Sequence, residues 1–140
     1  MCEDLELTVE SDLNNLAQIG EFVTRAALCL GLDGQQAFEV QMATDEACTN
    51  IVEHAYGIGV AGEINIRCTL EGEDFVVALR DHGRSFDPEQ VAEPNLACPL
   101  EERQIGGLGL YFMRKLMDRI VFRFDPVMGN ELRMYKRRHR

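Results

Sequence analysis

The feature that most constrains the fold is a pair of strand-like segments joined by a short turn. Residues 62–70 carry an apolar side chain at every second position, and residues 75–80 form a second apolar run after the turn Glu-Gly-Glu-Asp. A two-residue apolar period predicts a strand with one buried face. A short turn between two such runs predicts an antiparallel hairpin. The apolar side of this hairpin must be covered by another layer of structure.

The rest of the chain supplies elements for that layer. Further strands are predicted at residues 4–9, 120–124 and 132–136. Helical spacing marks residues 13–30 after a possible cap at Ser11, residues 34–56 after a cap at Asp33, and residues 108–117. The predicted order is strand, helix, helix, strand, strand, loop, helix, strand, strand. We therefore expect one α+β domain over residues 1–140, a two-layer sandwich with helices on one face of a mixed, mostly antiparallel sheet.

Composition and charge narrow the class of protein. The net charge is −10 although residues 133–140 contribute +5, so the body of the chain is strongly acidic. Nucleic-acid binding depends on neutralising phosphates, so we expect no nucleic-acid partner and a solvated basic tail. No apolar run approaches the ~20 residues that cross a bilayer, and the acidic start does not suit a signal peptide. We expect a cytoplasmic protein that does not bind membranes.

Five cysteines are spread along the chain without a C-x-x-C pair. Their odd number and wide spacing indicate neither a disulfide framework nor a zinc site. Cys29, Cys48 and Cys68 lie in apolar patterns, which predicts that they are small core residues.

Residues 43–56 form the first candidate site. Glu46, Asn50 and His54 are four residues apart, so a helix would place them on one face, with small and apolar residues on the opposite side. A carboxylate can accept a proton, and an amide oxygen can bind a hard cation such as Mg²⁺. The alternative is an ordinary solvated helix face with a capping histidine.

A second candidate follows the strand at residues 75–80. Asp81 comes directly after the apolar run, and Gly83 follows two residues later. An aspartate at a strand end is often only a turn residue. Alternatively, a fixed carboxylate at the mouth of an apolar pocket can accept a hydrogen bond from the amino group of adenine, while the glycine lets the backbone approach the base.

A third candidate is I-G-G-L-G-L, residues 105–110, directly before a predicted helix. Glycines at a helix start free backbone N–H groups to face an anion, although the stretch could also be a hinge. It matches neither the Walker phosphate loop nor the dinucleotide-binding pattern. The preceding residues 87–105 hold three prolines, five acidic residues and Arg103. A loop of this length in a small domain suggests a functional lid.

Taken together, Glu-x-x-x-Asn, Asp-x-Gly, a Pro-rich loop and Gly-Gly-Leu-Gly-Leu resemble the GHKL ATP-binding proteins, which include sensor histidine kinases and gyrase B. The segments T-N-I-V-E-H-A-Y, F-D-P and G-G-L-G-L-Y-F-M-R-K-L-M-D resemble the stand-alone anti-sigma-factor serine kinases of the RsbW and SpoIIAB type. The resemblance covers essentially the whole chain. It implies a Bergerat ATP-binding fold in which residues 87–105 are a flexible ATP lid.

The resemblance also implies roles for single residues. Glu46 would be the general base, and Asn50 would bind Mg²⁺ that bridges the phosphates of ATP. Asp81 would bind the adenine amino group, and Gly83 would leave room for the base. The implied phosphate contacts come from Gly106, Gly107, Leu108, Gly109 and Leu110, with His54 and Arg103 as weaker candidates. The family often has a glycine where this chain has Ser85 and a threonine where it has Asn130, which can still hydrogen-bond near adenine.

By the same resemblance, the expected function is that of an anti-sigma factor with serine/threonine kinase activity. It would hold a sigma factor, use ATP and Mg²⁺ to phosphorylate a STAS-domain antagonist, and form a homodimer. One alternative is a binding module that is gated by nucleotide and has no useful phosphotransfer. Another is an α+β domain whose motifs are accidental.

Overall fold

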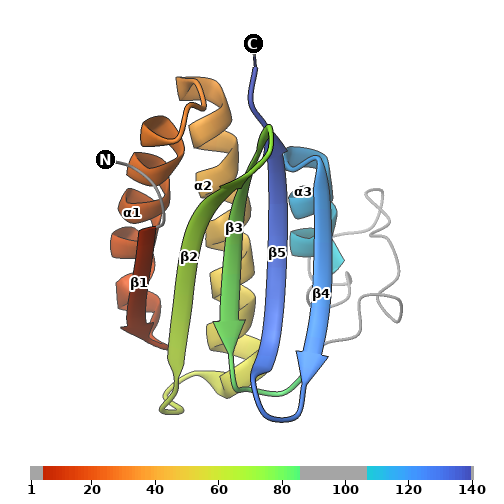
Figure 1. Cartoon of the computed structure of the whole chain (residues 1–140). Coiled ribbons are helices and arrows are strands. Elements are labelled where there is room, and N and C mark those ends of the chain that lie inside the picture. Colours follow the sequence, from red (N-terminus) through yellow and green to blue (C-terminus); the bar gives the residue numbers. More distant parts are fainter. Residues whose placement is uncertain (1–4, 86–106, 140) are drawn as a thin grey trace, which may run out of the picture.

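Helices cover one face of a five-stranded sheet in the computed structural model, which describes residues 5–85 and 107–139 (Figure 1). The strands are β1 (Leu5–Glu10), β2 (Glu63–Glu71), β3 (Asp74–Asp81), β4 (Arg119–Asp125) and β5 (Gly129–Arg137). The main helices are α1 (Leu16–Cys29), α2 (Gly34–Asn50) and α3 (Gly107–Leu116). A 3₁₀ turn, η1 (Leu13–Asn15), precedes α1, and a π-helical segment, η2 (Ile51–Gly57), continues α2.

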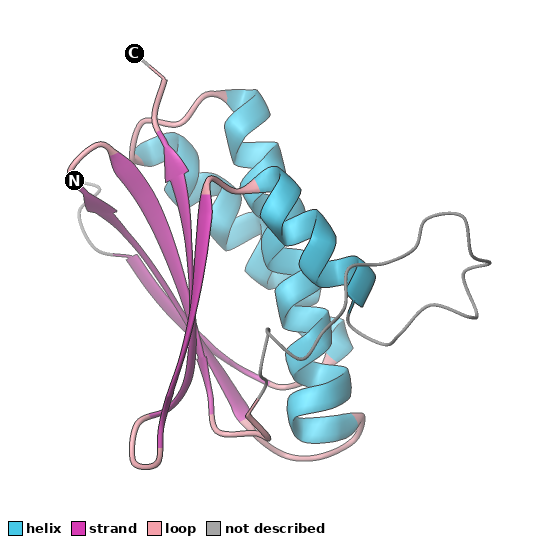
Figure 2. Ribbon diagram, turned by 90° about the vertical axis from the view of Figure 1, so that its right-hand side faces the viewer, coloured by secondary structure: helices cyan, strands magenta, loops and turns pink. Residues whose placement is uncertain are grey.

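The two-layer α+β prediction is confirmed (Figure 2). The strand order is β1-β2-β3-β5-β4, so β5 lies between β3 and β4. Each pairing between described strands is antiparallel, which makes this part of the sheet wholly antiparallel and not mixed. Because β5 pairs with β3 on one side and β4 on the other, the end of β3 and the β4–β5 turn lie at the same end of the sheet.

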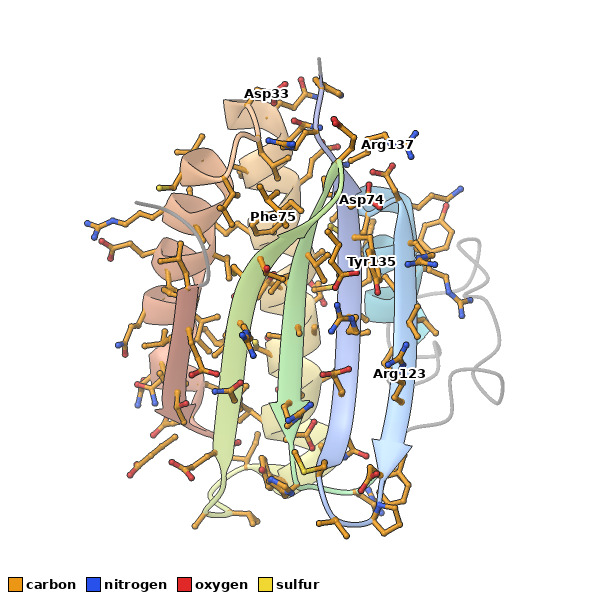
Figure 3. All side chains as sticks on the ribbon, in the orientation of Figure 1. Asp33, Asp74, Phe75, Arg123, Tyr135 and Arg137 are labelled. Carbon is orange, nitrogen blue, oxygen red and sulfur yellow. The ribbon has the colours of Figure 1, made fainter. Side chains whose placement is uncertain are left out.

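The core lies between the sheet and the helices. The alternating apolar positions of β2 are fully buried, as are the inward positions of α1 and α2: Ile64, Ile66, Cys68, Val23, Val40 and Ala43. The opposite face of the sheet, which faces the reader in Figure 3, carries most of its charged side chains. There Tyr135 is buried beneath the guanidinium of Arg119, which lies 4.0 Å from the ring centroid. The two layers therefore form because side chains alternate between the two faces of each strand, so that one face of the sheet is apolar and is covered by helices.

Of the two predicted N-terminal helix caps, the one at Ser11 is wrong and the one at Asp33 is confirmed. Asp12, and not Ser11, caps the first helical turn, because its side chain accepts a hydrogen bond from the N–H of Asn14 at 2.8 Å. Ser11 is buried, and its N–H donates to the carbonyl of Gly62 at 2.8 Å. The cap at Asp33 is confirmed, since Asp33 and Gln36 form a reciprocal capping box.

The described part of the basic tail contacts the rest of the protein, whereas a solvated tail was expected. The carbonyl of Arg137 accepts a hydrogen bond from Nε2 of the buried Gln36 at 2.7 Å. His139 Nδ1 lies 2.9 Å from Asp33 Oδ2, and the Arg138 side chain packs against Gly31. Figure 3 shows Asp33 and Arg137 at the same end of the molecule. The described part of the tail therefore packs onto the α1–α2 connection.

The cysteine prediction holds for two of three residues. Cys48 and Cys68 are buried free thiols, and burial raises the pKa of Cys68 to about 12. Cys29 is exposed at the end of α1, so the prediction that it is a core residue is wrong. Within residues 5–85 and 107–139, no helix combines the length and apolar character that a membrane span requires.

Candidate functional site

Glu46 and Asn50 lie one turn apart on α2 and converge on the first turn of α3. A Cβ atom placed on Gly109 would lie 3.3 Å from Glu46 Oε2 and 3.2 Å from Asn50 Nδ2. The two side chains therefore share one face of the helix, as their four-residue spacing predicts. Gly109 is small enough to let α3 approach this pair closely, so a carboxylate and an amide meet the start of a helix.

The column of polar residues changes geometry after Asn50. Residues 51–57 are π-helical, with hydrogen bonds from residue i to i+5, so the turn is wider than in an α-helix. A four-residue step consequently no longer keeps His54 in line with Asn50. His54 is exposed, and its Nε2 lies 4.0 Å from Glu53 Oε1. The predicted contact of His54 with nucleotide stays a prediction.

The electrostatic setting of Glu46 suits a group that accepts a proton. Partial burial raises the pKa of its carboxyl group, and the negative charges of Asp45 and Glu53 raise it further. A raised pKa means that the carboxylate binds a proton more readily than an ordinary glutamate does. This is the direction in which general bases are commonly tuned.

Asp81 is a buried carboxylate with a fixed orientation. Only 5% of it is exposed, at the end of β3. Its Oδ1 accepts hydrogen bonds from the N–H of Gly83 at 2.8 Å and from Nδ2 of Asn130 at 2.9 Å. Both contacts hold the same oxygen, so the carboxylate cannot rotate freely. A buried, oriented acceptor of this kind can select a ligand that donates a hydrogen bond.

Gly83 is required by a contact within the protein. A Cβ atom at this position would lie 2.5 Å from the backbone carbon of Ala55 and 2.6 Å from its oxygen. The N–H of Arg84 donates to the same carbonyl of Ala55 at 2.7 Å. The close approach of the β3 turn to the π-helical segment is therefore a reason for glycine here, and the predicted room for a base at Gly83 stays a prediction.

Tyr56 is a part of this site that the sequence reasoning missed. Its hydroxyl donates to the carbonyl of Glu63 at 2.8 Å and accepts from the N–H of His82 at 2.7 Å. The ring lies over Gly62, where a Cβ atom would be only 2.4 Å from Tyr56 Cε1. Tyr56 therefore ties the residue after Asp81 to the start of β2. Its partners lie 7 and 26 residues away, so no local spacing could have revealed it.

Asn130 organises the turn that follows Asp81. Besides Asp81, its Nδ2 donates to the carbonyls of Gly83 at 3.0 Å and Arg84 at 3.3 Å. The preceding Gly129 has a φ of +90°, and a Cβ there would lie 2.4 Å from the carbonyl oxygen of Asp81. The amide predicted to lie near adenine is thus placed beside Asp81. Its described contacts position the turn.

The glycine-rich stretch lies partly within the described residues. Gly107, Leu108, Gly109 and Leu110 form the first turn of α3. The first N–H groups of a helix lack partners within the helix, so the backbone here can bind an anion. The Leu110 side chain is 3% exposed and belongs to the core, so only its backbone is available. Arg103, Gly106 and the predicted lid at 87–105 lie outside the described residues.

The chemistry of the donor set fits Mg²⁺ together with a phosphate ligand. Among residues 5–85 and 107–139, no group of three or more His, Cys, Asp or Glu side chains could hold a metal ion alone. Two oxygen atoms flank Gly109: a Cβ atom placed on this glycine would lie 3.8 Å from Asn50 Oδ1 and 3.3 Å from Glu46 Oε2. Mg²⁺ prefers hard oxygen donors and usually takes one or two from the protein and others from phosphates and water.

Comparison with known proteins places this arrangement in context. A family model described as a histidine kinase-like ATPase domain matches residues 9–136. A serine-protein kinase RsbW of Halalkalibacterium halodurans is 29% identical over 127 residues, covering 88% of this chain and 77% of that protein. A serine-protein kinase RsbW of Bacillus cereus is 32% identical over 130 residues, covering 90% of this chain and 81% of that protein.

Solved structures share the fold at lower identity. The crystal structure of the RsbU and RsbW domains of Rv1364c from Mycobacterium tuberculosis aligns with a TM-score of 0.68 at 18% identity and covers 96% of this chain. This chain spans 32% of that longer one. The histidine kinase domain of the Erythrobacter litoralis EL346 blue-light activated kinase aligns with a TM-score of 0.54 at 17% identity, covering 85% of this chain and 60% of that one.

Proposed function

Because the chain belongs to the histidine kinase-like ATPase family, and within it to the RsbW serine-protein kinases, we propose that it is an anti-sigma factor that phosphorylates a protein on serine or threonine. ATP is the phosphate donor, and a STAS-domain antagonist protein is the acceptor. The observation that carries the proposal is the convergence of Glu46 and Asn50 on Gly109 at the start of α3.

Asp81 recognises the base in this proposal. The two hydrogen bonds on Oδ1 orient the carboxylate, and its Oδ2 accepts a hydrogen bond from the exocyclic amino group of adenine. Guanine presents a carbonyl oxygen at the corresponding position, which a carboxylate repels. The site therefore discriminates ATP from GTP through a buried acceptor, a kind of contact that can give large selectivity.

The phosphates bind between α2 and the start of α3. The N–H groups of the first turn from Gly107 to Leu110 would bind them, and Gly106 and Arg103, which lie outside the described residues, remain predicted phosphate contacts. Asn50 would supply the protein ligand to Mg²⁺, and His54, which the π-helical turn moves out of line with Asn50, stays the weaker candidate for a nucleotide contact. When bound, Mg²⁺ neutralises charge on the phosphate oxygens and fixes their geometry.

Glu46 acts as the base in phosphotransfer. Its carboxylate accepts the proton of the serine or threonine hydroxyl while the hydroxyl oxygen bonds to the γ-phosphorus. The bond from that phosphorus to the bridging oxygen breaks, and ADP leaves with the negative charge. The raised pKa of Glu46 favours the transfer of that proton.

Family membership supports a proposal for the partners as well. The chain holds a sigma factor in one nucleotide state and its antagonist in the other, and phosphorylation releases the antagonist. It acts as a homodimer in the cytoplasm. The acidic body, with a net charge of −10 for the whole chain, favours protein partners over nucleic acid.

A second candidate is a binding module gated by nucleotide without useful phosphotransfer. Glu46, although partly desolvated, remains accessible to a protein substrate, but its position does not by itself identify one. One experiment separates the two. The full chain is incubated with Mg²⁺, γ-labelled ATP and the STAS-domain protein encoded beside its gene, and the acceptor is analysed by mass spectrometry.

The kinase proposal predicts phosphoserine or phosphothreonine on the acceptor and a loss of about 100-fold or more in rate for Glu46→Gln. Glu21→Gln serves as the matched control, because Glu21 is exposed on α1 and pairs only with Arg25 in the described ion pairs. This variant should phosphorylate the acceptor at the normal rate. ATP binding without label transfer would favour the gated module. Equal rates for Glu46→Gln and the parent chain would refute the assignment of the base.

A further inference from the structure

A row of three residues crosses the sheet at the level of Asp81. Asp81 on β3 pairs with Asn130 on β5, and Asn130 pairs with Phe124 on β4. The three strands lie side by side in this order (Figure 1). Directly paired residues point to the same side of a sheet, so a carboxylate, an amide and a phenyl ring form a continuous row. The row joins the predicted base-binding carboxylate to the edge strand.

The side of the sheet on which this row lies follows from the register. Ile120 pairs with Met134, and Phe122 pairs with Leu132, further along the same two strands. Met134 and Leu132 are buried in the core, and Ile120 and Phe122 pack against it. Because side chains alternate along a strand, Phe124 lies on the same helix-facing side.

Phe124 differs from its neighbours in exposure. It is 61% exposed, whereas Leu132 is 7% and Met134 is 0% exposed on the same face. A large aromatic ring thus lies exposed beside Asn130, one strand further from Asp81. Adjacent strands are about 4.8 Å apart, so Phe124 lies about 10 Å from Asp81 across two strands, a span that accommodates a purine.

We propose that Phe124 is a binding residue whose ring packs against the purine of the bound nucleotide and adds affinity. This inference deepens the proposed function and rests on it, since Asp81 must hold the amino group for the base to reach Phe124. Aromatic side chains stack on bases of any kind and add affinity, while Asp81 supplies the selection for adenine. Phe124 thus acts on the base and not on the phosphates.

The β4–β5 turn provides a matched control. Val127 is 82% exposed in this turn, whose backbone is held by Asp125, because Asp125 Oδ1 accepts from the N–H groups of Val127 at 2.7 Å and Met128 at 2.9 Å. Val127 lies outside the paired row that contains Phe124. Val127→Ala therefore removes exposed apolar surface nearby without changing the row.

The test is calorimetric titration of the full chain with Mg-ATP and, separately, with Mg-tripolyphosphate, which lacks a base. Phe124→Ala should bind ATP about 10-fold more weakly, Phe124→Tyr should bind within about twofold of the parent chain, and tripolyphosphate affinity should not change. Val127→Ala should bind ATP normally. Thermal unfolding of each variant checks that the fold is intact.

Two results would overturn the role of Phe124 alone: undiminished ATP affinity in Phe124→Ala, or an equal loss for ATP and tripolyphosphate. A parent chain that binds no ATP at all would instead overturn the proposed function on which the inference rests. The two failures are therefore distinguishable in the same titrations.

Discussion

Gly83→Ala should destabilise the fold strongly, because the added methyl group has no space. It would lie 2.5 Å and 2.6 Å from the backbone carbon and oxygen of Ala55, while real Cβ atoms essentially never come closer than 3.0 Å to such atoms. Relief requires a shift of about half an ångström in a backbone segment, which cannot rotate away as a side chain can. The shift also strains the hydrogen bond from Arg84 to Ala55.

The expected cost adds two contributions. Overpacking in a filled site costs about 1–3 kcal/mol, and loss of one hydrogen bond costs about 1 kcal/mol. The free energy of unfolding should therefore fall by about 2–4 kcal/mol. For a chain of this size each kcal/mol lowers Tm by about 3–5 °C, so we expect Tm to fall by about 6–20 °C. Circular dichroism at 222 nm during heating measures the change.

Gly34→Ala is the control for this experiment. A Cβ atom at Gly34 meets nothing within 4 Å, and the residue begins α2. Alanine is favoured over glycine in a helix, so this variant should unfold at or slightly above the parent temperature. A Gly83→Ala chain that unfolds within about 1 °C of the parent would show that the close approach of residues 83 and 55 is not real.

Two further predictions concern the residues around the site. Tyr56→Phe removes the hydroxyl that bridges Glu63 and His82. The free energy of unfolding in a denaturant titration should therefore fall by about 1–2 kcal/mol, and ATP should bind more weakly. Unchanged values for both would count against Tyr56 as a link between β2 and β3. Asp45→Asn removes a negative charge that raises the pKa of Glu46, so Glu46 should stay deprotonated to lower pH. The acid limb of the pH profile of kcat/KM for phosphotransfer should therefore move to lower pH. An acid limb that stays in place or moves to higher pH would contradict the role of Glu46 as the base.

Much of the fold could be predicted from local patterns. The alternation in β2 and the helical spacing of α1 and α2 reflect which side chains must leave water, so the strands, helices and layers are close to the predicted ones. The cap at Asp33 was also predictable, since a capping box involves only neighbouring residues. The cap at Asp12 was missed because Ser11 and Asp12 are both good caps, and tertiary contacts bury Ser11.

The placement of Glu46 and Asn50 on one helix face could be predicted from the sequence, whereas the geometry around the candidate residues could be predicted only in part. Four-residue spacing on one helix places Glu46 and Asn50 together, and the structure adds Gly109 from a distant segment. A π-helical turn has no reliable sequence signal, so the changed direction of His54 could not be predicted. The roles of Tyr56 and Gly83 depend on contacts between segments far apart in the chain. Such contacts are set by tertiary packing and leave no local pattern.

Asp81→Asn tests most directly whether a purine nucleotide binds with its amino group on Asp81. An asparagine oxygen can still accept from Gly83 and Asn130, so the turn should remain folded, but the new NH₂ group faces the adenine amino group. Calorimetric titration with Mg-ATP should show affinity at least about 100-fold weaker than in the parent chain. Equal ATP affinity in a folded Asp81→Asn chain would contradict the account.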